Sequence, residues 1–359
     1  MSGAPVATAS GSDLFGFADL CEAMAGPITN LISYAPLTVP MNRIGHMFSR
    51  LKRFHLLPVL CFVFLFSSCA RTPALQGGDV NTGMTPFEGG TFEASGVAAV
   101  SGTDGVLFVD NGRPGQVFWM GLDQNGKQAS AIKGLALGTD IEDIEGITTD
   151  GTYFYVVSSQ SRPKAVASTG LARFKFDTRS QSVDGVVTIG GLKNFLVENV
   201  AELRGEGDRK GKDGGINIEG LAWDPGHGRL LLGMRSPVVD GQALLVPLKL
   251  RDPRGAFTID NLQVEGGKAI RLSLGGLGVR GFEYDERAKV FRILSGATEE
   301  QQSTDFVLWQ WNGDEKQPVL REINKFDKTL KPEGVARATS GKRDFLIVVF
   351  DAGGYTIME

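Results

Sequence analysis

Residues 217–224 read NIEGLAWD, and a related phrase occurs four more times, with a charged or polar residue followed by glycine and an apolar residue. The related phrases are EASGVA (93–98), DIEGIT (143–148), VRGFEY (279–284) and KPEGVA (331–336). Successive phrase glycines lie 50, 74, 61 and 53 residues apart. A phrase that recurs at such intervals is typical of a chain built from repeated structural units.

Each phrase is followed by a turn and then by two runs of residues typical of β-strands. The first of these runs are VLFVDNG (106–112), YFYVVSSQS (153–161), RLLLGMRSP (229–237), KVFRILSGA (289–297) and FLIVVFDAG (345–353). The runs after them are QVFWMGLD (116–123), GLARFKFD (170–177), ALLVPLKL (243–250), FVLWQWNGD (306–314) and GYTIME (354–359). Val, Ile, Leu and aromatic residues dominate both sets, which predicts consecutive antiparallel strands.

The length of the units favours an all-β fold, the β-propeller, in which four-stranded blades radiate around a central channel. We predict five blades, although a sixth could lie in the 74-residue interval. In that interval we interpret NFLVENVAELRG (194–205) as a helical insertion and GEGDRKGKDGG (205–215) as a solvated loop. The last phrase leaves residues for three strands only, so the residues before Glu93 should supply the fourth. N- and C-terminal strands would then close the ring.

The phrase should begin the innermost strand of each blade, beside the channel. Pro332 fits the start of a strand whose inner edge is unpaired, and the glycine fits a place where backbones crowd near the axis. Because the second strand is antiparallel to the first, its end should share a channel mouth with the phrase. The residues before the glycines are Ser95, Glu145, Glu219, Arg280 and Glu333. The ends of the second strands add Asp110 with Asn111, Ser158 with Ser159, Arg235, Ser295 and Asp351.

Two hypotheses explain this ring of polar residues. In the first, each glutamate bonds to backbone N–H groups of the next inner strand, with Arg235 and Arg280 as buried ion partners. In the second, the mouth binds a ligand. The binding residues would be Asp110, Glu145, Glu219, Arg235, Arg280, Glu333 and Asp351.

The chemistry of the ring allows more than one ligand. Clustered carboxylates favour a hard cation such as calcium, for which Glu145, Glu219 and Glu333 are the candidate ligands. The two arginines favour a phosphate or carboxylate group instead. Crowded acids also raise one another's pKa, which is how such clusters become general acids or bases.

The N-terminal region predicts a lipoprotein signal. A basic stretch, MFSRLKRFH (47–55), precedes the apolar run LLPVLCFVFLF (56–66), which is too short to span a bilayer as a helix. SSC (67–69) follows and resembles a bacterial lipobox, in which Cys69 would become the lipidated N-terminus. We therefore expect a signal peptide over 47–68, a lipidated linker over 69–90 and the propeller over 91–359. Residues 1–46 would be an upstream mis-start or a disordered extension.

The signal also predicts where the protein is found. The lipid on Cys69 would tie the protein to a membrane on the extracytoplasmic side. Many lipoproteins that stay at the inner membrane have Asp directly after the lipidated cysteine, and here that residue is Ala70. In a cell with two membranes we therefore expect the periplasmic side of the outer membrane.

Composition and motifs argue against several other functions. The chain has 359 residues and a formal net charge of −4, so it lacks the basic excess that would predict nucleic-acid binding. After cleavage before Cys69 the only histidine would be His227, and no G-x-S-x-G elbow is present, so Ser-His-Asp catalysis is not expected. The scarcity of His and Cys also argues against zinc. The stretch GGLGVRG (275–281) is interpreted as a turn, since no helix pattern follows it.

Three stretches closely resemble a bacterial family known only as a domain of unknown function. They are NIEGLAWDPGHGRLLLGMRSPVVDGQALLVPL (217–248), GGLGVRGFEYD (275–285) and KPEGVAR…DFLIVVFDAG (331–353). The family belongs with the phytase-like, esterase-like propellers, so the resemblance implies a propeller fold and an extracytoplasmic location. Some phytase-like propellers are calcium-dependent phosphate-ester hydrolases with an acidic channel mouth. The residues that match the family pattern are Glu219, Arg235, Arg280, Glu283 and Glu333.

The sequence thus predicts a lipid-anchored propeller whose acidic, arginine-bearing channel mouth binds a small-molecule or protein ligand. The alternative is a calcium-assisted hydrolase of the phytase-like or esterase-like kind. Whether the protein is an enzyme at all stays open at this point.

Overall fold

The computed structural model describes residues 83–163, 169–298 and 304–359. The predicted signal peptide (47–68), the segment before it (1–46) and the lipidation residue Cys69 lie outside the described residues. Within the described ranges, no helix is long and apolar enough to cross a membrane.

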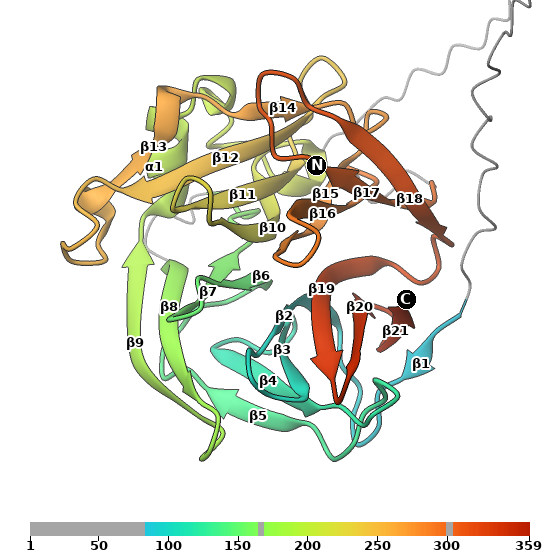
Figure 1. Ribbon diagram of the computed structural model, residues 1–359. Coiled ribbons are helices and arrows are strands. Elements are labelled where there is room, and N and C mark those ends of the chain that lie inside the picture. Colours follow the sequence, from blue (N-terminus) through green and yellow to red (C-terminus); the bar gives the residue numbers. More distant parts are fainter. Residues whose placement is uncertain (1–82, 164–168, 299–303) are drawn as a thin grey trace, which may run out of the picture. The chain divides into compact units, whose positions relative to one another are not determined.

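The fold is a five-bladed β-propeller, as predicted, and each blade is an antiparallel sheet (Figure 1). Blade one consists of β2 (Ala94–Ala99), β3 (Gly105–Asp110), β4 (Gln116–Gly121) and β5 (Lys133–Ala136). Blade two consists of β6 (Ile144–Thr149), β7 (Phe154–Ser158), β8 (Thr169–Asp177) and β9 (Ser182–Gly190). Blade three consists of β10 (Asn217–Asp224), β11 (Arg229–Ser236), β12 (Ala243–Leu250), β13 (Leu262–Val264) and β14 (Ile270–Leu272). Blade four consists of β15 (Gly278–Asp285), β16 (Val290–Gly296), β17 (Phe306–Trp311) and β18 (Leu320–Phe326). Blade five consists of β19 (Pro332–Ser340), β20 (Arg343–Phe350), β21 (Gly354–Met358) and β1 (Thr85–Pro86).

The two ends of the propeller chain meet in blade five. The N-terminal strand β1 lies antiparallel to the C-terminal strand β21 over two residue pairs. The pairs are Thr85 with Tyr355 and Pro86 with Gly354. Phe87 follows β1 and stacks on Phe108 of blade one, with ring centroids 5.2 Å apart. The prediction that residues before Glu93 supply the missing outer strand is confirmed, and β1 falls within the segment expected to be a linker (69–90).

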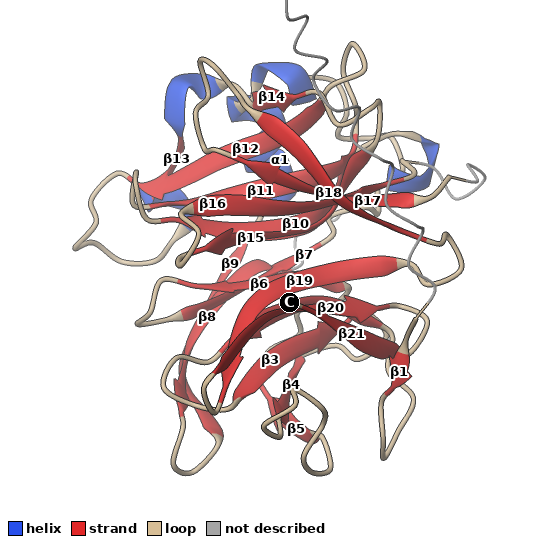
Figure 2. Ribbon diagram, turned by 45° about the vertical axis from the view of Figure 1, so that its right-hand side comes forward, coloured by secondary structure: helices blue, strands red, loops and turns tan. Residues whose placement is uncertain are grey.

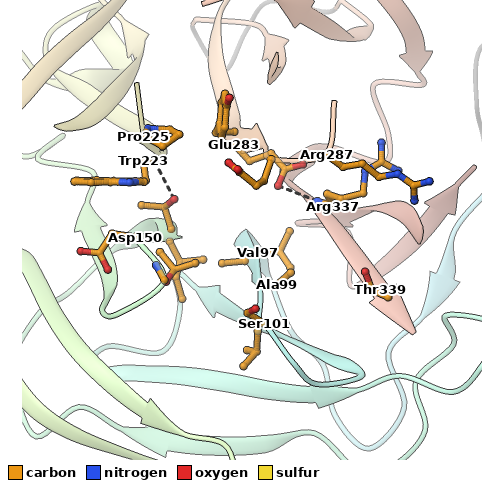
Figure 3. A pocket seen from close by; sticks show the side chains of 18 of the residues that line it. Val97, Ala99, Ser101, Asp150, Trp223, Pro225, Glu283, Arg287, Arg337 and Thr339 are labelled. Carbon is orange, nitrogen blue, oxygen red and sulfur yellow. Dashed lines mark hydrogen bonds between the residues drawn. The ribbon is translucent and has the colours of Figure 1, made fainter. Parts of the chain in front are cut away.

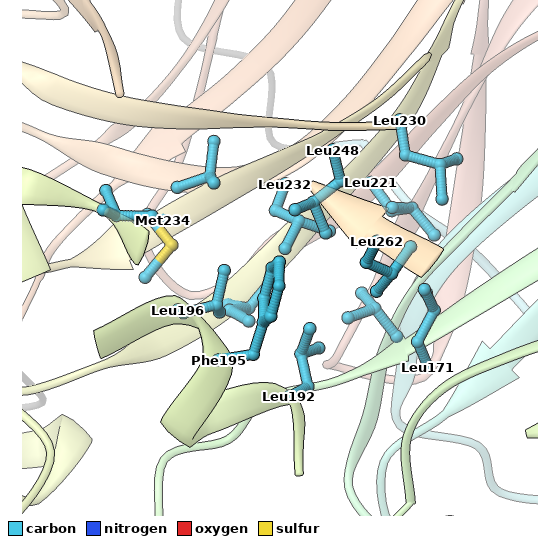
Figure 4. Packing of buried hydrophobic residues seen from close by; sticks show 14 of the residues in the cluster. Leu171, Leu192, Phe195, Leu196, Leu221, Leu230, Leu232, Met234, Leu248 and Leu262 are labelled. Atoms are coloured by element: carbon cyan, nitrogen blue, oxygen red, sulfur yellow. The ribbon is translucent and has the colours of Figure 1, made fainter. Parts of the chain in front are cut away.

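Among the described residues, helical segments occur only between β9 and β14 (Figure 2). They are α1 (Leu192–Asn199) and the 3-10 helices η1 (Ala201–Leu203), η2 (Gly211–Asp213), η3 (Ile259–Asn261) and η4 (Glu265–Gly267). The 74-residue interval therefore holds the expected helical insertion and no sixth blade. Helix α1 directs Leu192, Phe195 and Leu196 between blades two and three, where they pack near Leu171 and Leu232 (Figure 4).

Buried apolar residues form five clusters, and each cluster lies between two neighbouring blades. Strand β3 shows how one strand serves two clusters. Val106 and Phe108 join the cluster with blade five, whereas Leu107 and Val109 join the cluster with blade two. Because successive side chains of a strand point to opposite faces, a strand buried on both faces needs an unbroken apolar run. This requirement explains the continuous hydrophobic runs of the sequence.

The innermost strands β2, β6, β10, β15 and β19 surround the channel (Figure 1) and come very close together at the phrase glycines. A Cβ atom at Gly334 would lie 2.9 Å from the Cα of Gly96, and one at Gly96 would lie 3.2 Å from the Cα of Gly146. A Cβ at Gly281 would lie 2.5 Å from the carbonyl oxygen of Glu333. Only glycine allows such an approach, so the predicted crowding of backbones near the axis is confirmed.

The residue before each phrase glycine is an extra residue in the pairing of the first strand with the second. In blade two the register passes from Ile144 opposite Ser158 to Gly146 opposite Val157, which leaves Glu145 without an opposite residue. The same irregularity occurs in the other four blades, at Ser95, Glu219, Arg280 and Glu333. Such a β-bulge bends the strand and changes the direction of a side chain. The repeated phrase is therefore a bulge that precedes a close backbone contact.

Replacement of Gly281 by alanine tests this contact. The new Cβ would meet backbone, which cannot rotate away as a side chain can. We therefore expect the free energy of unfolding to fall by an amount at or above the upper part of the ~1–3 kcal/mol range typical of overpacking. Urea unfolding followed by circular dichroism measures the change. Gly121→Ala is the matched control, because its Cβ would meet nothing nearer than the Ser130 Oγ at 3.7 Å. Equal stability of the two variants would contradict the interpretation.

Candidate functional site

The five bulged residues gather at the end of the channel where the inner strands begin, here called the phrase mouth. They are Ser95, Glu145, Glu219, Arg280 and Glu333, and each is at most 6% exposed. The ends of the second strands lie beside them, because Ser158 pairs with Ile144 and Ser295 pairs with Val279. The predicted neighbourhood of phrase and second-strand end is thus present in the fold.

Arg280 holds two of the three glutamates. Its Nη1 lies 2.8 Å from the Glu219 Oε2, and its Nη2 forms an ion pair with the Glu333 Oε1. Burial alone would lower the pKa of Arg280, but Glu219, Glu333 and Glu145 outweigh it and raise that pKa, so the guanidinium stays charged. A buried ion pair needs this kind of multiple contact, because removal from water costs each charge several kcal/mol.

Glu219 has two further partners. The Arg235 Nη1 lies 2.9 Å from the Glu219 Oε1, and the Asn217 Nδ2 donates to the same oxygen at 3.0 Å. Arg235 is itself fixed, since its Nε donates to the carbonyl oxygen of Ala297 at 3.1 Å. Arg235 and Arg280 are therefore the ion partners that the first hypothesis expected.

Glu145 differs from the other two glutamates. The residue is 6% exposed, yet no hydrogen bond or ion pair joins its carboxyl to any side chain in the described part of the chain. Burial raises the pKa of Glu145 well above its usual value, and the nearby carboxylates of Glu219, Glu333 and Asp143 raise it further, against the opposing effect of Arg280. In Glu333 burial also raises the pKa, but Arg280 counteracts it, and the result is about 7.

A cavity of about 470 Å³ opens beside Glu145. It is lined by Asn111, Asp143, Glu145, Ser159, Ser161, Arg162, Pro163, Lys210, Gly211, Lys212, Asn217, Glu219 and Arg235. Its volume falls in the range of small-molecule sites, ~300–1,000 Å³. Of the predicted binding residues, the structure brings Glu145, Glu219 and Arg235 to the wall of this cavity and places Arg280 and Glu333 next to them.

The lysines of the cavity come from the loop 205–215, which we expected to be merely solvated. Gly211 is pinned between Lys210 and Lys212, because its N–H donates to the Ser161 carbonyl oxygen at 2.9 Å. The Ser236 hydroxyl also donates to the Gly211 carbonyl oxygen at 3.2 Å. The one sequence signal for this role was that the loop lies in an insertion between two blades, since insertions of this kind often form the walls of binding sites.

Asp110 and Asp351 are not among the residues that line the cavity. Asp110 accepts the N–H groups of Glu93 at 3.2 Å and of Gly112 at 2.9 Å, and it therefore fixes the turn after β3. Asp351 forms an ion pair with Lys331 at 2.6 Å. The Asp351 carboxyl is close enough to act electrostatically on the ring, because it helps to raise the pKa of Glu333.

The bonds between inner strands lie three residues beyond the bulges, not at them. The N–H of Trp223 in β10 donates to the Thr148 Oγ1 at 3.1 Å, and the N–H of Arg337 in β19 donates to the Glu283 Oε2 at 2.8 Å (Figure 3). The backbone bonds that the first hypothesis assigned to the phrase glutamates are thus made by Thr148 and Glu283. In the three other blades the same position is alanine, whose side chain cannot accept a hydrogen bond.

Thr148 and Glu283 line a second cavity, of about 720 Å³, at the opposite end of the channel (Figure 3). Trp223, Arg337 and Asp150 also line it. A much smaller cavity, of about 10 Å³, is lined by four of the phrase glycines, Gly96, Gly146, Gly281 and Gly334. The two larger cavities thus lie at opposite ends of the inner strands, with the crowded glycines near the phrase mouth.

The phrase mouth does not have the donor set that calcium prefers. Calcium takes six to eight oxygen ligands, whereas two of the three glutamates already neutralise Arg280. The described residues contain no group of three or more His, Cys, Asp or Glu that could hold a metal ion. Calcium binding by Glu145, Glu219 and Glu333 stays a prediction, and we derive no chemistry from it.

One family model matches part of the chain. Residues 208–356, which contain blades three and four and most of blade five, match a family described as a protein of unknown function (DUF3616). No curated protein matches the chain. The chain is thus a five-bladed β-propeller whose C-terminal part is similar to DUF3616.

Several solved propellers are distantly similar. The PQQ domain of a pyranose dehydrogenase from Coprinopsis cinerea is 11% identical, with a TM-score of 0.43 over 78% of this chain and 98% of that one. The soluble aldose sugar dehydrogenase from Escherichia coli is 10% identical, with a TM-score of 0.40 over 74% of this chain and 95% of that one. At these values the likeness carries no inference about activity.

Replacement of Glu283 by glutamine tests the electrostatics of the channel. Burial raises the pKa of Glu283 from 4.5 to about 8, with Asp285 adding to the rise and Arg337 opposing it. The native protein then holds a proton that the unfolded chain has lost, so stability should fall as pH rises from about 4.5 to about 8. The slope from this group is at most about 1.4 kcal/mol per pH unit.

Urea unfolding of both proteins between pH 5 and pH 9 gives the comparison. Glutamine resembles the neutral acid, so the stability of the variant should lack this fall. The free energy of unfolding of the variant should therefore rise relative to that of the parent protein as pH rises. A constant difference across this interval would show that Glu283 is ionised in the native protein throughout.

Proposed function

We propose that the phrase mouth is the ligand-binding site of this propeller and that small polar molecules occupy its cavity. The observation that carries the proposal is Glu145, a buried carboxyl that faces a cavity and has no partner among the described residues. A buried polar group without a partner is unfavourable. Groups of this kind are retained where a ligand supplies the missing contact.

The rest of the mouth supports this interpretation. Glu219 and Glu333 are neutralised within the protein, so they are explained by structure alone. The cavity also holds amide, hydroxyl and basic side chains, which supply both donors and acceptors. Such a mixed polar wall on a rigid β scaffold suits recognition of a small polar ligand.

The alternative of a calcium-assisted ester hydrolase has no comparable observation in its favour. A metal-assisted hydrolase needs a metal with an open coordination position beside the substrate. Arg280 occupies the space between Glu219 and Glu333, where a metal shared by these two carboxylates would lie. We therefore propose binding as the function of the site.

Two glutamine variants separate a binding residue from a structural one. Glu145→Gln removes an unpartnered acid and should raise the free energy of unfolding at pH 7, by about 0.5–2 kcal/mol. Glu219→Gln breaks a buried ion-pair network and should lower it by about 3–5 kcal/mol. Thermal and urea unfolding of the parent and both variants measure the two effects.

The comparison has a clear adverse outcome. If Glu145→Gln destabilises the protein as much as Glu219→Gln does, Glu145 has a structural partner in solution. The unpartnered carboxyl would then not exist, and the proposal would lose the observation on which it stands.

We also propose that the propeller is an extracytoplasmic lipoprotein attached through Cys69. The proposal rests on the signal-like sequence at 47–68 and on the SSC lipobox. Mass spectrometry of the protein from membranes should show an N-terminal Cys69 that carries lipid. A Cys69→Ser variant should stay unprocessed, and an intact unmodified chain that begins at Met1 would refute the anchor.

A further inference from the structure

We propose that the ligand of the phrase mouth is a small zwitterion of the amino-acid type. Its ammonium group would bind Glu145 at the inner end of the cavity, and its carboxylate would bind the rim formed by Lys210 and Lys212. This inference rests on the proposed function, because it names the class of ligand for the same cavity.

The inner end of the cavity favours a cation. The ring of bulged residues contains three carboxylates but only one arginine, and Arg280 contacts Glu219 and Glu333 without reaching an ion-pair distance to Glu145. The fifth place in the ring is Ser95, whose short side chain adds no charge. Arg235 adds a second positive charge, but it contacts Glu219 as well, so an ammonium group beside Glu145 would supply the counter-charge of the third carboxylate.

The charged groups around Glu145 also favour a cation. The carboxylates of Glu219 in β10, Glu333 in β19 and Asp143 before β6 all disfavour a negative charge on Glu145, and Arg280 in β15 opposes them. Because the local field is negative, a positive ligand group is attracted there and would ionise Glu145 when it binds.

The outer end of the cavity favours an anion. Lys210 and Lys212 line the cavity and are exposed, whereas Glu145 is buried, and neither lysine forms an ion pair with any residue in the described ranges. Arg162 lines the same side but already pairs with Glu142 at 2.8 Å. Since Gly211 between the two lysines is held by Ser161 and Ser236, the lysines project from a fixed point of backbone.

Opposite charges at the two ends of one cavity select a ligand that carries both. A simple anion would meet the negative field at Glu145, and a simple cation would have to pass the basic rim. A neutral polyol would leave Glu145 without a counter-ion. A molecule with an ammonium and a carboxylate group satisfies both ends, and charge-assisted hydrogen bonds at each end would fix its orientation.

Isothermal titration calorimetry with the standard L-amino acids tests the proposal on the purified propeller. At least one amino acid should bind at millimolar concentration. For the tightest binder, the decarboxylated amine and the deaminated acid should each bind about tenfold more weakly or worse, since each lacks one charged contact.

Variants then assign the two ends. Glu145→Gln should weaken the amino acid and the amine but leave the acid unchanged. The double variant Lys210→Ala, Lys212→Ala should weaken the amino acid and the acid but leave the amine unchanged. Lys342→Ala is the matched control, because this exposed lysine lies in the turn between β19 and β20, away from the phrase mouth.

Proton release gives a readout that a purely structural role of Glu145 would not produce. Binding should release a proton from Glu145, so the measured heat should depend on the ionisation enthalpy of the buffer. In Glu145→Gln this release should disappear. Burial also raises the pKa of Glu333, to about 7, but Glu333 is unchanged in the variant, so its share is subtracted by the comparison.

The outcomes separate this inference from the proposed function. If a neutral sugar or a simple acid binds in a Glu145-dependent way and amino acids do not, the zwitterion is wrong and the binding site stands. If no amino acid binds, the inference is overturned. If, in addition, Glu145→Gln destabilises the protein as much as Glu219→Gln does, the proposed function fails with it.

Discussion

The contact between the inner strands at their glycines is the constraint on which the rest of the structure depends. The inner strands approach each other so closely around the axis that a Cβ at Gly96, Gly146, Gly281 or Gly334 would meet main-chain atoms of the next blade, and one at Gly220 would meet its side chains. Each strand reaches this point through a bulge, and the bulge turns one polar residue toward the phrase mouth. The close approach leaves a cavity of only about 10 Å³ among these glycines.

A ring of charges can be buried at this place only because most of them cancel. Arg280 lies between Glu219 and Glu333, and Arg235 adds a second positive charge on Glu219. The repeat therefore gives five equivalent backbone positions, while substitution at each position makes the ring asymmetric. Among the described residues, Glu145 is the one glutamate of the ring that no arginine neutralises by an ion pair. The properties of the site therefore depend on the differences between the five equivalent positions, which hold three glutamates, one arginine and one serine.

Much of the architecture could be predicted from the sequence, because it follows from periodic features. The recurrent phrase gave the blade count, the doubly buried runs gave the strands, and the shortage of residues after Gly334 predicted the closing strand. The close approach of the inner strands could also be predicted, because a glycine recurs at the same position of every phrase. The insertion at 194–205 stood out as the one stretch with a helical period.

The details of the site were harder, because they depend on which side chains meet across blades. The sequence placed Asp110 and Asp351 with the glutamates, but turns and a lysine hold them away from the cavity wall. It could not show that Arg280 satisfies two glutamates and leaves Glu145 alone. The loop that contains Lys210 and Lys212 looked solvated, since its charges balance in sequence and only its folding back onto Ser161 gives it a role.

The seam in blade five has a mechanical consequence. Blades one to four are each a continuous stretch of chain, whereas the fifth is completed by a strand of two residues from the other end. Any pulling force that enters through the N-terminal segment reaches this strand before it reaches the rest of the ring. The clasp should therefore peel first, and the first loss of structure under load would be the opening of blade five from its outer edge.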